Sequence, residues 1–351
     1  FTATDGSTQV VSVNVTGTAD ASVVSGTFTG AVTEGYIGDA PVTATGSIAI
    51  SDVDADDTPS CAEVAATTGA NGFGTLDVVA GTWTFTLDQS AVQDLDAGDV
   101  VSDTFTFTAT DGSTQVVSVN ITGTDDASVV SGTFTGAVTE GNIGDAPVTA
   151  TGSIAISDVD VDDNPTFNDV AATTGANGFG TFELVSGTWT FTLDQSAVQD
   201  LDAGDVVSDT ITFTATDGST QVVSVNITGT DDASVVSGTF TGAVTEGNIG
   251  DAPVTASGSI AISDIDADDT PSFADVPATT GTNGFGTFEL VAGTWTFTLD
   301  QSAVQDLEAG DVVSDTITFT ATDGSTQVVS VNITGTEDAS VVSGTLTGAV
   351  T

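Results

Sequence analysis

The chain contains no lysine, arginine or histidine, against 50 aspartates and glutamates, so its formal net charge at neutral pH is −50. Binding to nucleic acid needs cationic side chains that displace counterions from phosphates. Binding to anionic membranes likewise needs basic clusters. The composition therefore excludes nucleic acid as a partner and argues against an anionic membrane. It also leaves solvent cations as the charges that can offset the self-repulsion, because no salt bridge between side chains can form.

The same absences remove most catalytic chemistry. Nucleophilic triads need a histidine or lysine base, and phosphoryl transfer needs a cationic group. A pair of carboxylates, as in glycoside hydrolysis, remains open. Every acid pair recurs in each copy of the internal repeat described below, however, whereas an active site is normally one unique constellation in a pocket. We therefore expect that the protein is not an enzyme.

Cysteine is represented by Cys61 alone, which excludes a disulfide within the chain. Cys61 stands where the other copies have Phe167 and Phe273, so it is predicted to be a small core substitute. A reactive thiol is the weaker interpretation, since no basic residue stands near it to stabilise a thiolate. The sequence shows no signal peptide and no apolar run long enough to cross a bilayer, so we expect no membrane insertion in this segment.

What the chain does contain is a near-identical internal repeat. The string FTATDGSTQVVSVN begins at Phe1, Phe107, Phe213 and Phe319, a constant spacing of 106 residues (107 − 1 = 106). TWTFTLDQSAVQDL recurs at the same spacing from Thr82, Thr188 and Thr294. A unit of this length is an ordinary size for one folding domain and is too long for a solenoid repeat.

The period predicts five segments. Residues 1–20 are the C-terminal strands of a truncated repeat, 21–126, 127–232 and 233–338 are one β-sandwich repeat each, and 339–351 are the first strand of a further repeat. We interpret the chain as a segment of something longer or as a processed protomer. Hydrophobic residues make up 39% of it, and each period carries a tryptophan and several phenylalanines. That content is enough for a packed core and argues against disorder.

Within one period, 127–232, alternating apolar and polar residues predict short strands from Ser131 and from Gly152. Two hairpins follow, with turns at Ser186-Gly187 and Asp217-Gly218. QSAVQDLDAGD is the only stretch with helical character, about one turn. About seven short strands separated by turns are typical of an immunoglobulin-like sandwich. The predicted fold class is all-β, with tandem immunoglobulin-like (cadherin-like) antiparallel β-sandwich domains arranged end to end.

The acids are predicted to gather at the two ends of each sandwich. The loop DVDVDD, 158–163, falls at one end, and the linker acids Asp231 and Asp232 fall at the other. End-to-end stacking would bring the linker acids near Asp264 and Asp266 of the following copy. Carboxylates that meet without a basic partner favour a hard cation, and oxygen ligands suit Ca²⁺, whereas zinc would want histidine or paired cysteine. The alternative, that these acids are solvated turn residues, stays open because aspartate is a good turn former.

The order of the motifs resembles that of VCBS-type and cadherin-like tandem repeats of large bacterial surface adhesins. The motifs are VTEG, then SDVDADD, SDVDVDD or SDIDADD, then GTWTFTLD, LDAGD or LEAGD, FTATDGS and the linker TGTDDA or TGTEDA. The resemblance implies Ca²⁺ at the domain junctions, held at one by Glu34, Asp96, Asp99, Asp125, Asp126, Asp158 and Asp160. At the next it implies Glu140, Asp202, Asp205, Asp231, Asp232, Asp264 and Asp266. The chain departs from the cadherin pattern in that LDAGD lacks its Arg-Glu, the linkers lack its Asn, and Ala19 replaces an aspartate in the first linker.

The function that this resemblance implies is a structural or adhesive repeat region, located outside the cell. We expect a Ca²⁺-stiffened stalk or fibre on a bacterial surface, with neighbouring repeats and identical chains as partners. The alternative is a multivalent module that binds surface glycans or cells. Its sugar platforms would be Trp83, Trp189 and Trp295, but their alternation with Phe and Leu on one strand face predicts a core role. We interpret the sequons at Asn14, Asn120, Asn226 and Asn332 as chance, because they lie inside a predicted strand.

Overall fold

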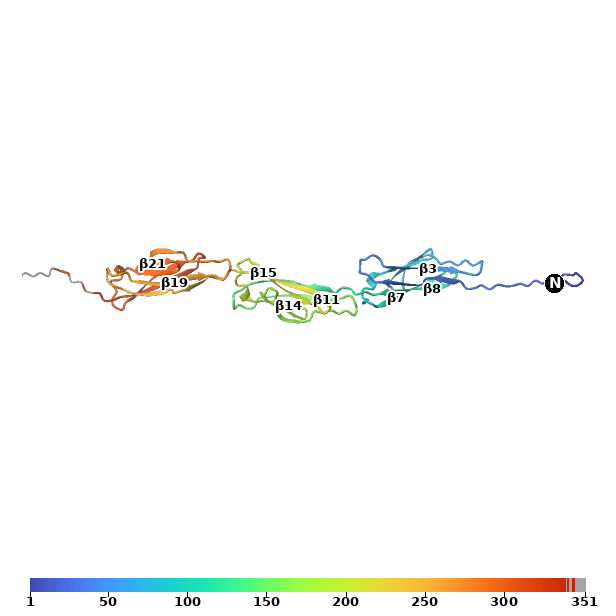
Figure 1. The fold of residues 1–351 in the computed structure, drawn as a ribbon, viewed down its shortest axis with the longest axis horizontal. Helices are drawn as coiled ribbons and strands as arrows, with labels where there is room; N and C mark the ends of the chain where they lie inside the picture. Colours follow the sequence, from blue (N-terminus) through green and yellow to red (C-terminus); the bar gives the residue numbers. More distant parts are fainter. Residues whose placement is uncertain (339, 341–342, 345–351) are drawn as a thin grey trace, which may run out of the picture. The chain divides into compact units, whose positions relative to one another are not determined.

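The computed structural model describes residues 1–338, 340 and 343–344. The chain forms two compact units, the first holding Phe1–Gly132, Ile154–Asn168 and Phe213–Gln221, and the second Thr133–Ser153, Asp169–Thr212 and Val222–Thr351. The first repeat therefore lies in the first unit, the third in the second unit, and the repeat 127–232 contributes to both. Figure 1 shows their strands coloured along the sequence.

The first repeat contains eight strands and one 3-10 turn. They are β1 (Val23–Gly26), β2 (Thr29–Thr33), β3 (Thr43–Ser51), β4 (Val64–Thr68), β5 (Gly74–Val79), β6 (Thr82–Leu87), η1 (Gln89–Ala91), β7 (Val100–Thr108) and β8 (Thr114–Thr122). The turn η1 is the single helical turn that the sequence predicts, and the side chain of Asp88 caps it by accepting from Ser90 N at 3.1 Å.

The same elements recur in the second and third repeats. The second has β9 (Val129–Gly132), β10 (Thr135–Thr139), β11 (Thr149–Ser157), β12 (Val170–Thr174), β13 (Gly180–Val185), β14 (Thr188–Leu193), η2 (Gln195–Ala197), β15 (Val206–Thr214) and β16 (Thr220–Thr228). The third has β17 (Val235–Gly238), β18 (Thr241–Thr245), β19 (Thr255–Ser263), β20 (Val276–Thr280), β21 (Gly286–Val291), β22 (Thr294–Leu299), η3 (Gln301–Ala303), β23 (Val312–Thr320) and β24 (Thr326–Thr334).

Each repeat pairs its strands into a five-stranded and a three-stranded sheet. In the first repeat the orders are β1-β3-β6-β5-β4 and β2-β8-β7, and the other two repeats have the same orders. Side chains from both sheets meet in one core, to which β3 contributes Ile48, β6 contributes Trp83 and β8 contributes Val119. The prediction of an all-β chain of repeated sandwiches is confirmed by this pairing.

The first predicted strand of each repeat is in fact divided between the two sheets. β1 pairs antiparallel with β3, whereas β2 pairs parallel with β8. The chain changes sheets after Gly26, whose φ is +143°. A Cβ at Gly26 would lie 2.0 Å from the carbonyl oxygen of Ser47, so only glycine fits there. The crossover places the end of β2 beside the end of β8, which matters for the acids that follow both strands.

The three tryptophans are core residues, as the alternation predicts. Trp83, Trp189 and Trp295 are each 0% exposed. The indole N–H of Trp83 donates to the carbonyl of Thr27 at 2.6 Å, so its polar edge is satisfied inside the protein. A fully buried indole offers no face on which a sugar could stack.

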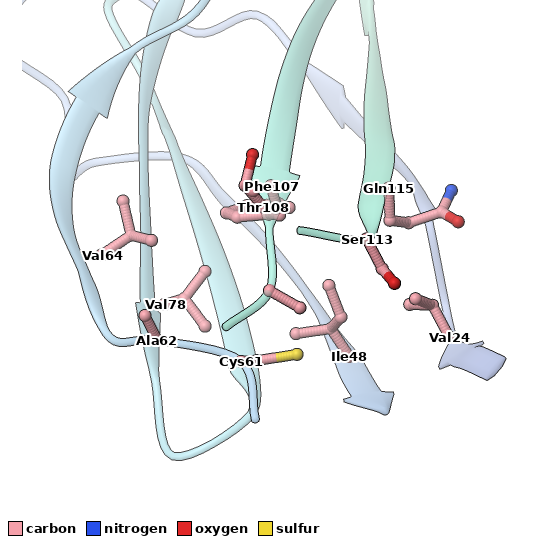
Figure 2. A pocket seen from close by; sticks show the side chains of 11 residues that line it. Val24, Ile48, Cys61, Ala62, Val64, Val78, Phe107, Thr108, Ser113 and Gln115 are labelled. Atoms are coloured by element: carbon pink, nitrogen blue, oxygen red, sulfur yellow. The ribbon is translucent and has the colours of Figure 1, made fainter. Parts of the chain in front are cut away.

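Cys61 also takes the predicted place against the core. It is half-buried and packs on the first core cluster. Figure 2 shows it beside a hollow lined by Ile48, Val78 and Phe107. The free volume of this hollow is about 10 Å³, which is no more than one water molecule needs.

The two terminal segments differ from the central repeats. Residues 1–20 were expected to form strands, but the structure has only an isolated bridge between Thr2 and Thr8 there. No described strand pairs with residues 1–20, and an isolated hairpin is marginally stable in water. The first strand predicted for 339–351 lies outside the described residues, apart from 340 and 343–344. Across the part of the chain that is described, no helix is long and apolar enough to span a membrane.

Candidate metal centre

The acid loop after the long strand β11 folds through its own aspartates. The backbone N–H of Asp160 donates to Asp158 Oδ1 at 3.1 Å, and the N–H of Asp163 donates to the carbonyl of Asp160 at 3.3 Å. In the loop after β19, the N–H of Asp266 likewise donates to Asp264 Oδ1, and the N–H of Asp269 donates to the carbonyl of Asp266. This i to i+3 turn carries the sixth residue of the motif back beside the third, because aspartate side chains readily hold turns of this kind.

The linker between repeats is tied to the same loop. Asp126 N donates to Asp160 Oδ2 at 2.8 Å, and Asp232 N donates to Asp266 Oδ2 at 2.7 Å. One oxygen of the second loop acid, Asp160 or Asp266, therefore accepts from the linker backbone, and its other oxygen is left for a different partner.

A glutamate from the preceding sandwich completes this arrangement. Glu140 directly follows β10, which pairs in parallel with β16, and its N–H donates to the carbonyl of Thr228 at 3.0 Å. Its Oε1 accepts from Thr230 N at 3.0 Å. The crossover of the first strand thus brings this glutamate beside the start of the linker.

The segment after the 3-10 turn also reaches the loop of the next repeat. In the first unit Val161 N donates to the carbonyl of Asp94 at 3.4 Å. In the second unit Ala267 N donates to the carbonyl of Asp200 at 3.2 Å, and Asp268 N donates to Asp202 Oδ2 at 3.3 Å. These bonds place Asp96 and Asp202 at the rim of the acid loops.

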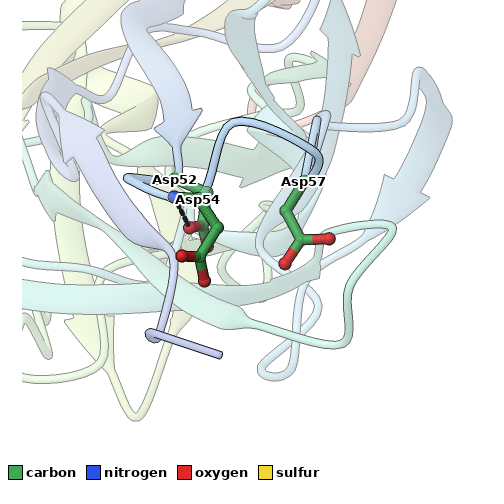
Figure 3. A group of neighbouring side chains, drawn as sticks. All are labelled: Asp52, Asp54 and Asp57. Atoms are coloured by element: carbon green, nitrogen blue, oxygen red, sulfur yellow. Dashed lines mark hydrogen bonds between the residues drawn. The ribbon is translucent and has the colours of Figure 1, made fainter. Parts of the chain in front are cut away.

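The result is a set of close carboxylate clusters, in each of which one oxygen from every member lies within 4.8 Å of the others. In the second unit they are Glu140, Asp232 and Asp266, and Asp202, Asp266 and Asp269; in the first unit they are Asp96, Asp160 and Asp163, and Asp52, Asp54 and Asp57. Asp266 belongs to both clusters of the second unit. Figure 3 shows the loop cluster of the first repeat, in which Asp54 N donates to Asp52 Oδ1 at 2.8 Å.

The predicted ligands divide into three groups. Asp96, Asp160, Glu140, Asp202, Asp232 and Asp266 lie in these clusters. Glu34, Asp126, Asp158 and Asp264 lie next to them, held by bonds to the same loops or linkers. Asp99, Asp125, Asp205 and Asp231 are exposed at the rim and belong to none of the clusters found among the described residues.

Sequence reasoning missed Asp163 and Asp269, as well as Asp52, Asp54 and Asp57 in the first loop. The signal that could have found them was the spacing of three residues between the fourth and seventh positions of SDVDVDD, which are Asp160 and Asp163. Within a turn, that spacing brings the two side chains together.

Several carboxylate oxygens of these clusters are buried and have no hydrogen-bond partner among the described residues. They include Glu140 Oε2, Asp160 Oδ1 and Asp266 Oδ1, together with Asp126 Oδ2 and Asp232 Oδ2. Glu140 is 6% exposed, Asp160 2% and Asp266 3%. An unpaired buried carboxylate is costly, so these oxygens require a cation or a proton.

The electrostatics of the clusters agree with this conclusion. Burial is the first cause that raises the pKa of Glu140 and of Asp232 above ordinary values, and the charge of Asp266 adds to both shifts. Burial also raises the pKa of Asp202 and of Asp269 at the rim, again with neighbouring carboxylates adding to it. A cation placed among these groups would relieve both causes at once.

No protein-family model and no curated protein matches the chain, so the finer assignment to VCBS repeats stays a prediction. Among solved structures the chain is similar to the extracellular cadherin domains 3–6 of protocadherin gamma B2, with 13% identity over 90% of this chain and 73% of that one and a TM-score of 0.39. It is similar to the protocadherin gammaB7 EC3-6 cis-dimer, with 11% identity over 90% and 74% and a TM-score of 0.42. A Ca²⁺-stabilized adhesin that helps an Antarctic bacterium bind ice matches with 16% identity over 92% and 75% and a TM-score of 0.22. All three TM-scores lie below 0.5, so the function proposed below is drawn from this chain's own carboxylates.

Proposed function

We propose that this chain is a non-enzymatic segment of an extracellular surface protein, in which Ca²⁺ at each repeat junction stiffens a stalk or fibre. The observation that carries the proposal is the convergence of buried, unpartnered carboxylate oxygens from two successive repeats and the linker between them. In the second unit these come from Glu140, Asp232 and Asp266.

The chemistry of the donor set selects the cation. Every side-chain ligand within reach is an oxygen, and the chain has no histidine and one cysteine. Ca²⁺ accepts six to eight oxygen ligands in flexible geometry, whereas zinc prefers nitrogen and sulfur. The carboxylates present therefore fit Ca²⁺, with backbone carbonyls such as that of Asp200 as further candidates.

The sharing of one ligand supports two ions at each junction. Asp266 belongs both to the deep cluster with Glu140 and Asp232 and to the rim cluster with Asp202 and Asp269. A carboxylate has two oxygens and about four lone-pair sites, so it can serve two neighbouring ions. In the first unit Asp160 occupies the same place between Glu34 and Asp126 on one side and Asp96 and Asp163 on the other.

Ligands from both sides of a linker explain why the ion would stiffen the chain. Without it, the carboxylates of the two repeats repel one another, and no basic side chain can intervene. With it, the end of one sandwich, the linker and the loop of the next are held by one charge centre. We propose the segments 21–126, 127–232 and 233–338 as the units that such ions connect.

The test is a Ca²⁺ titration of the whole chain by calorimetry, combined with melting curves and small-angle scattering. A ligand at about a hundredfold above its dissociation constant stabilises the folded state by roughly 2.7 kcal/mol per site. We expect chelator to lower Tm and to shorten the maximum dimension, and Na⁺ at equal ionic strength not to restore either. An unchanged melting curve and scattering profile in excess chelator would sink the proposal.

A further inference from the structure

A glutamine follows the 3-10 turn of each repeat, and in the first repeat it donates to the junction glutamate Glu34. Gln93, Gln199 and Gln305 occupy the same position of the QSAVQD motif, just after the 3-10 turn. Gln93 is 8% exposed and Gln199 6%. Because the chain has no lysine, arginine or histidine, an uncharged amide is among the strongest side-chain donors it can offer a buried carboxylate.

One hydrogen of this amide has the same partner in all three repeats. The Nε2 group donates to the carbonyl of Gly35 at 2.8 Å in the first repeat. The equivalent distances are 2.8 Å from Gln199 to Gly141 and 2.9 Å from Gln305 to Gly247. This bond anchors the side chain and leaves the second amide hydrogen available for another acceptor.

The contact of this side chain with the glutamate differs between repeats of nearly the same sequence. Gln93 Nε2 also donates to Glu34 Oε1 at 2.7 Å, and Glu34 Oε2 accepts from Thr124 N at 3.2 Å. Both oxygens of Glu34 are thereby satisfied. In the second repeat Gln199 accepts from Ile143 N at 3.3 Å, and Glu140 Oε2 has no partner among the described residues.

We infer that this glutamine is a positioning residue that competes with the cation for the junction glutamate, so that its amide serves as a neutral substitute when no ion is bound. The inference rests on the proposed Ca²⁺ site. An amide hydrogen carries partial positive charge, so it is repelled by a cation bound to the same carboxylate, and the side chain turns from the glutamate. The arrangement of Gln199 shows that it can do so without losing its bond to the glycine carbonyl.

The consequence is a site whose affinity is reduced in exchange for a more stable metal-free sandwich. The glutamine partly satisfies the glutamate when Ca²⁺ is withdrawn, and the ion must displace this hydrogen bond when it returns. Binding becomes weaker and more readily reversible than the carboxylates alone would make it.

The experiment compares two triple variants of the full chain. Gln93→Met, Gln199→Met and Gln305→Met together remove the competing amide and keep a similar side-chain volume. The matched control is Gln89→Met, Gln195→Met and Gln301→Met, which removes a neighbouring glutamine whose Oε1 accepts from the same glycine's N–H, at 3.0 Å for Gly35. The Nε2 group of this control glutamine donates to no junction glutamate among the described residues.

We expect the first variant to bind Ca²⁺ roughly two- to tenfold more tightly by calorimetry, the effect of losing one competing hydrogen bond. Its Tm in chelator should fall, and its Tm in saturating Ca²⁺ should fall by less. A merely structural role predicts equal losses in both conditions and no gain in affinity, as in the control, and this result would overturn the inference.

The single variant Gln93→Met keeps the test usable where the triple variant does not fold, because the second and third repeats stay intact. It should raise the Ca²⁺ affinity of the junction site that contains Glu34 and leave the affinity of the other sites as in the parent chain. An unchanged binding isotherm would count against the inference. Failure of the parent chain to bind Ca²⁺ at all is a separate outcome, which removes the proposed function itself.

Discussion

Two segments of this chain share one sequence and have different structures. FTATDGSTQVVSVN occurs at 1–14 and again at 107–120. In the second place it contributes the end of β7 and most of β8, and Val119 is 0% exposed; in the first place the equivalent Val13 is 77% exposed. The turn forms in both, with Ala3 N to Ser7 O at 2.7 Å and Ala109 N to Ser113 O at 2.8 Å. The turn is therefore encoded locally, whereas the strands form only where β2 is available to pair with them.

The acid loops show the same contrast. Asp20 N donates to Asp54 Oδ2 at 2.8 Å, the bond that Asp126 N makes to Asp160 Oδ2. Asp160 is buried beneath the preceding sandwich, while Asp54, on whose loop no described sandwich packs, is only half-buried. Local bonds shape the loop, and burial of its carboxylate depends on a second repeat.

The largest expected effect comes from a charge placed in each copy of the shared sequence. Val119→Asp should unfold or severely destabilise the first sandwich, by about 4 kcal/mol or more, because the new carboxylate is buried without a partner. Val13→Asp, its control, should change the stability by less than about 0.5 kcal/mol. Thermal melting of the two variants checks this, and equal effects would mean that residues 1–14 are packed in solution.

A smaller effect is expected at the junction acids. Asp232→Asn and Asp266→Asn should each weaken the same proposed Ca²⁺ site. The double variant should cost less than the sum by about 1–2 kcal/mol, since the two carboxylates belong to one cluster. Both variants should shorten the maximum dimension in scattering while the buried Trp189 and Trp295 keep their fluorescence. Asp54→Asn is the control, because Asp54 belongs to the separate loop cluster of the first repeat, and it should leave the junction binding unchanged. Strictly additive losses would indicate solvated turn residues instead.

Filling the core beside Cys61 sharpens the comparison between the first repeat and the others. Cys61→Phe restores the residue found at 167 and 273, and the ring should pack against the core side chains that line the hollow. We expect a gain of about 1 kcal/mol in the melting of the first repeat, the order of a cavity-filling change. A loss would show that Ile48 and Val78 cannot move aside, so that the ring overpacks the site.

The smallest and most gradual effect is that of pH in chelator. The pKa of Glu140 and of Asp232 is raised, chiefly by burial. Their contribution to stability is therefore fully present below the ordinary carboxyl pKa and is lost as the pH rises through the raised values. Hydrogen bonds from Ser128 and Ser219 lower the pKa of Asp217. The contribution of Asp217 to stability is therefore lost only as the pH falls below the ordinary aspartate pKa. Stability should rise on acidification from neutral pH and then decline.

The variant Glu140→Gln tests that assignment. Its melting temperature should depend less steeply on pH between neutrality and the ordinary glutamate pKa, whereas Asp217→Asn should alter the profile only at lower pH. An identical slope in Glu140→Gln and the parent chain would assign the effect to the general charge of −50.

The sequence by itself determined the period, the all-β class, the hairpin turns, the single 3-10 turn and the burial of Trp83, Trp189 and Trp295. These follow from local patterns, namely alternation along a strand, glycine in turns and aspartate caps, which repeat with the chain. Only the tertiary structure decided that the first strand divides at Gly26, that Asp163 and Asp269 join the clusters while Asp99 and Asp205 do not, and that Gln93 reaches Glu34. It also shows the copy of FTATDGSTQVVSVN at 107–120 paired with β2, whereas the copy at 1–14 has one isolated bridge. Each of these depends on which segments, distant along the chain, lie beside one another, and a pattern confined to one segment carries no record of its neighbours.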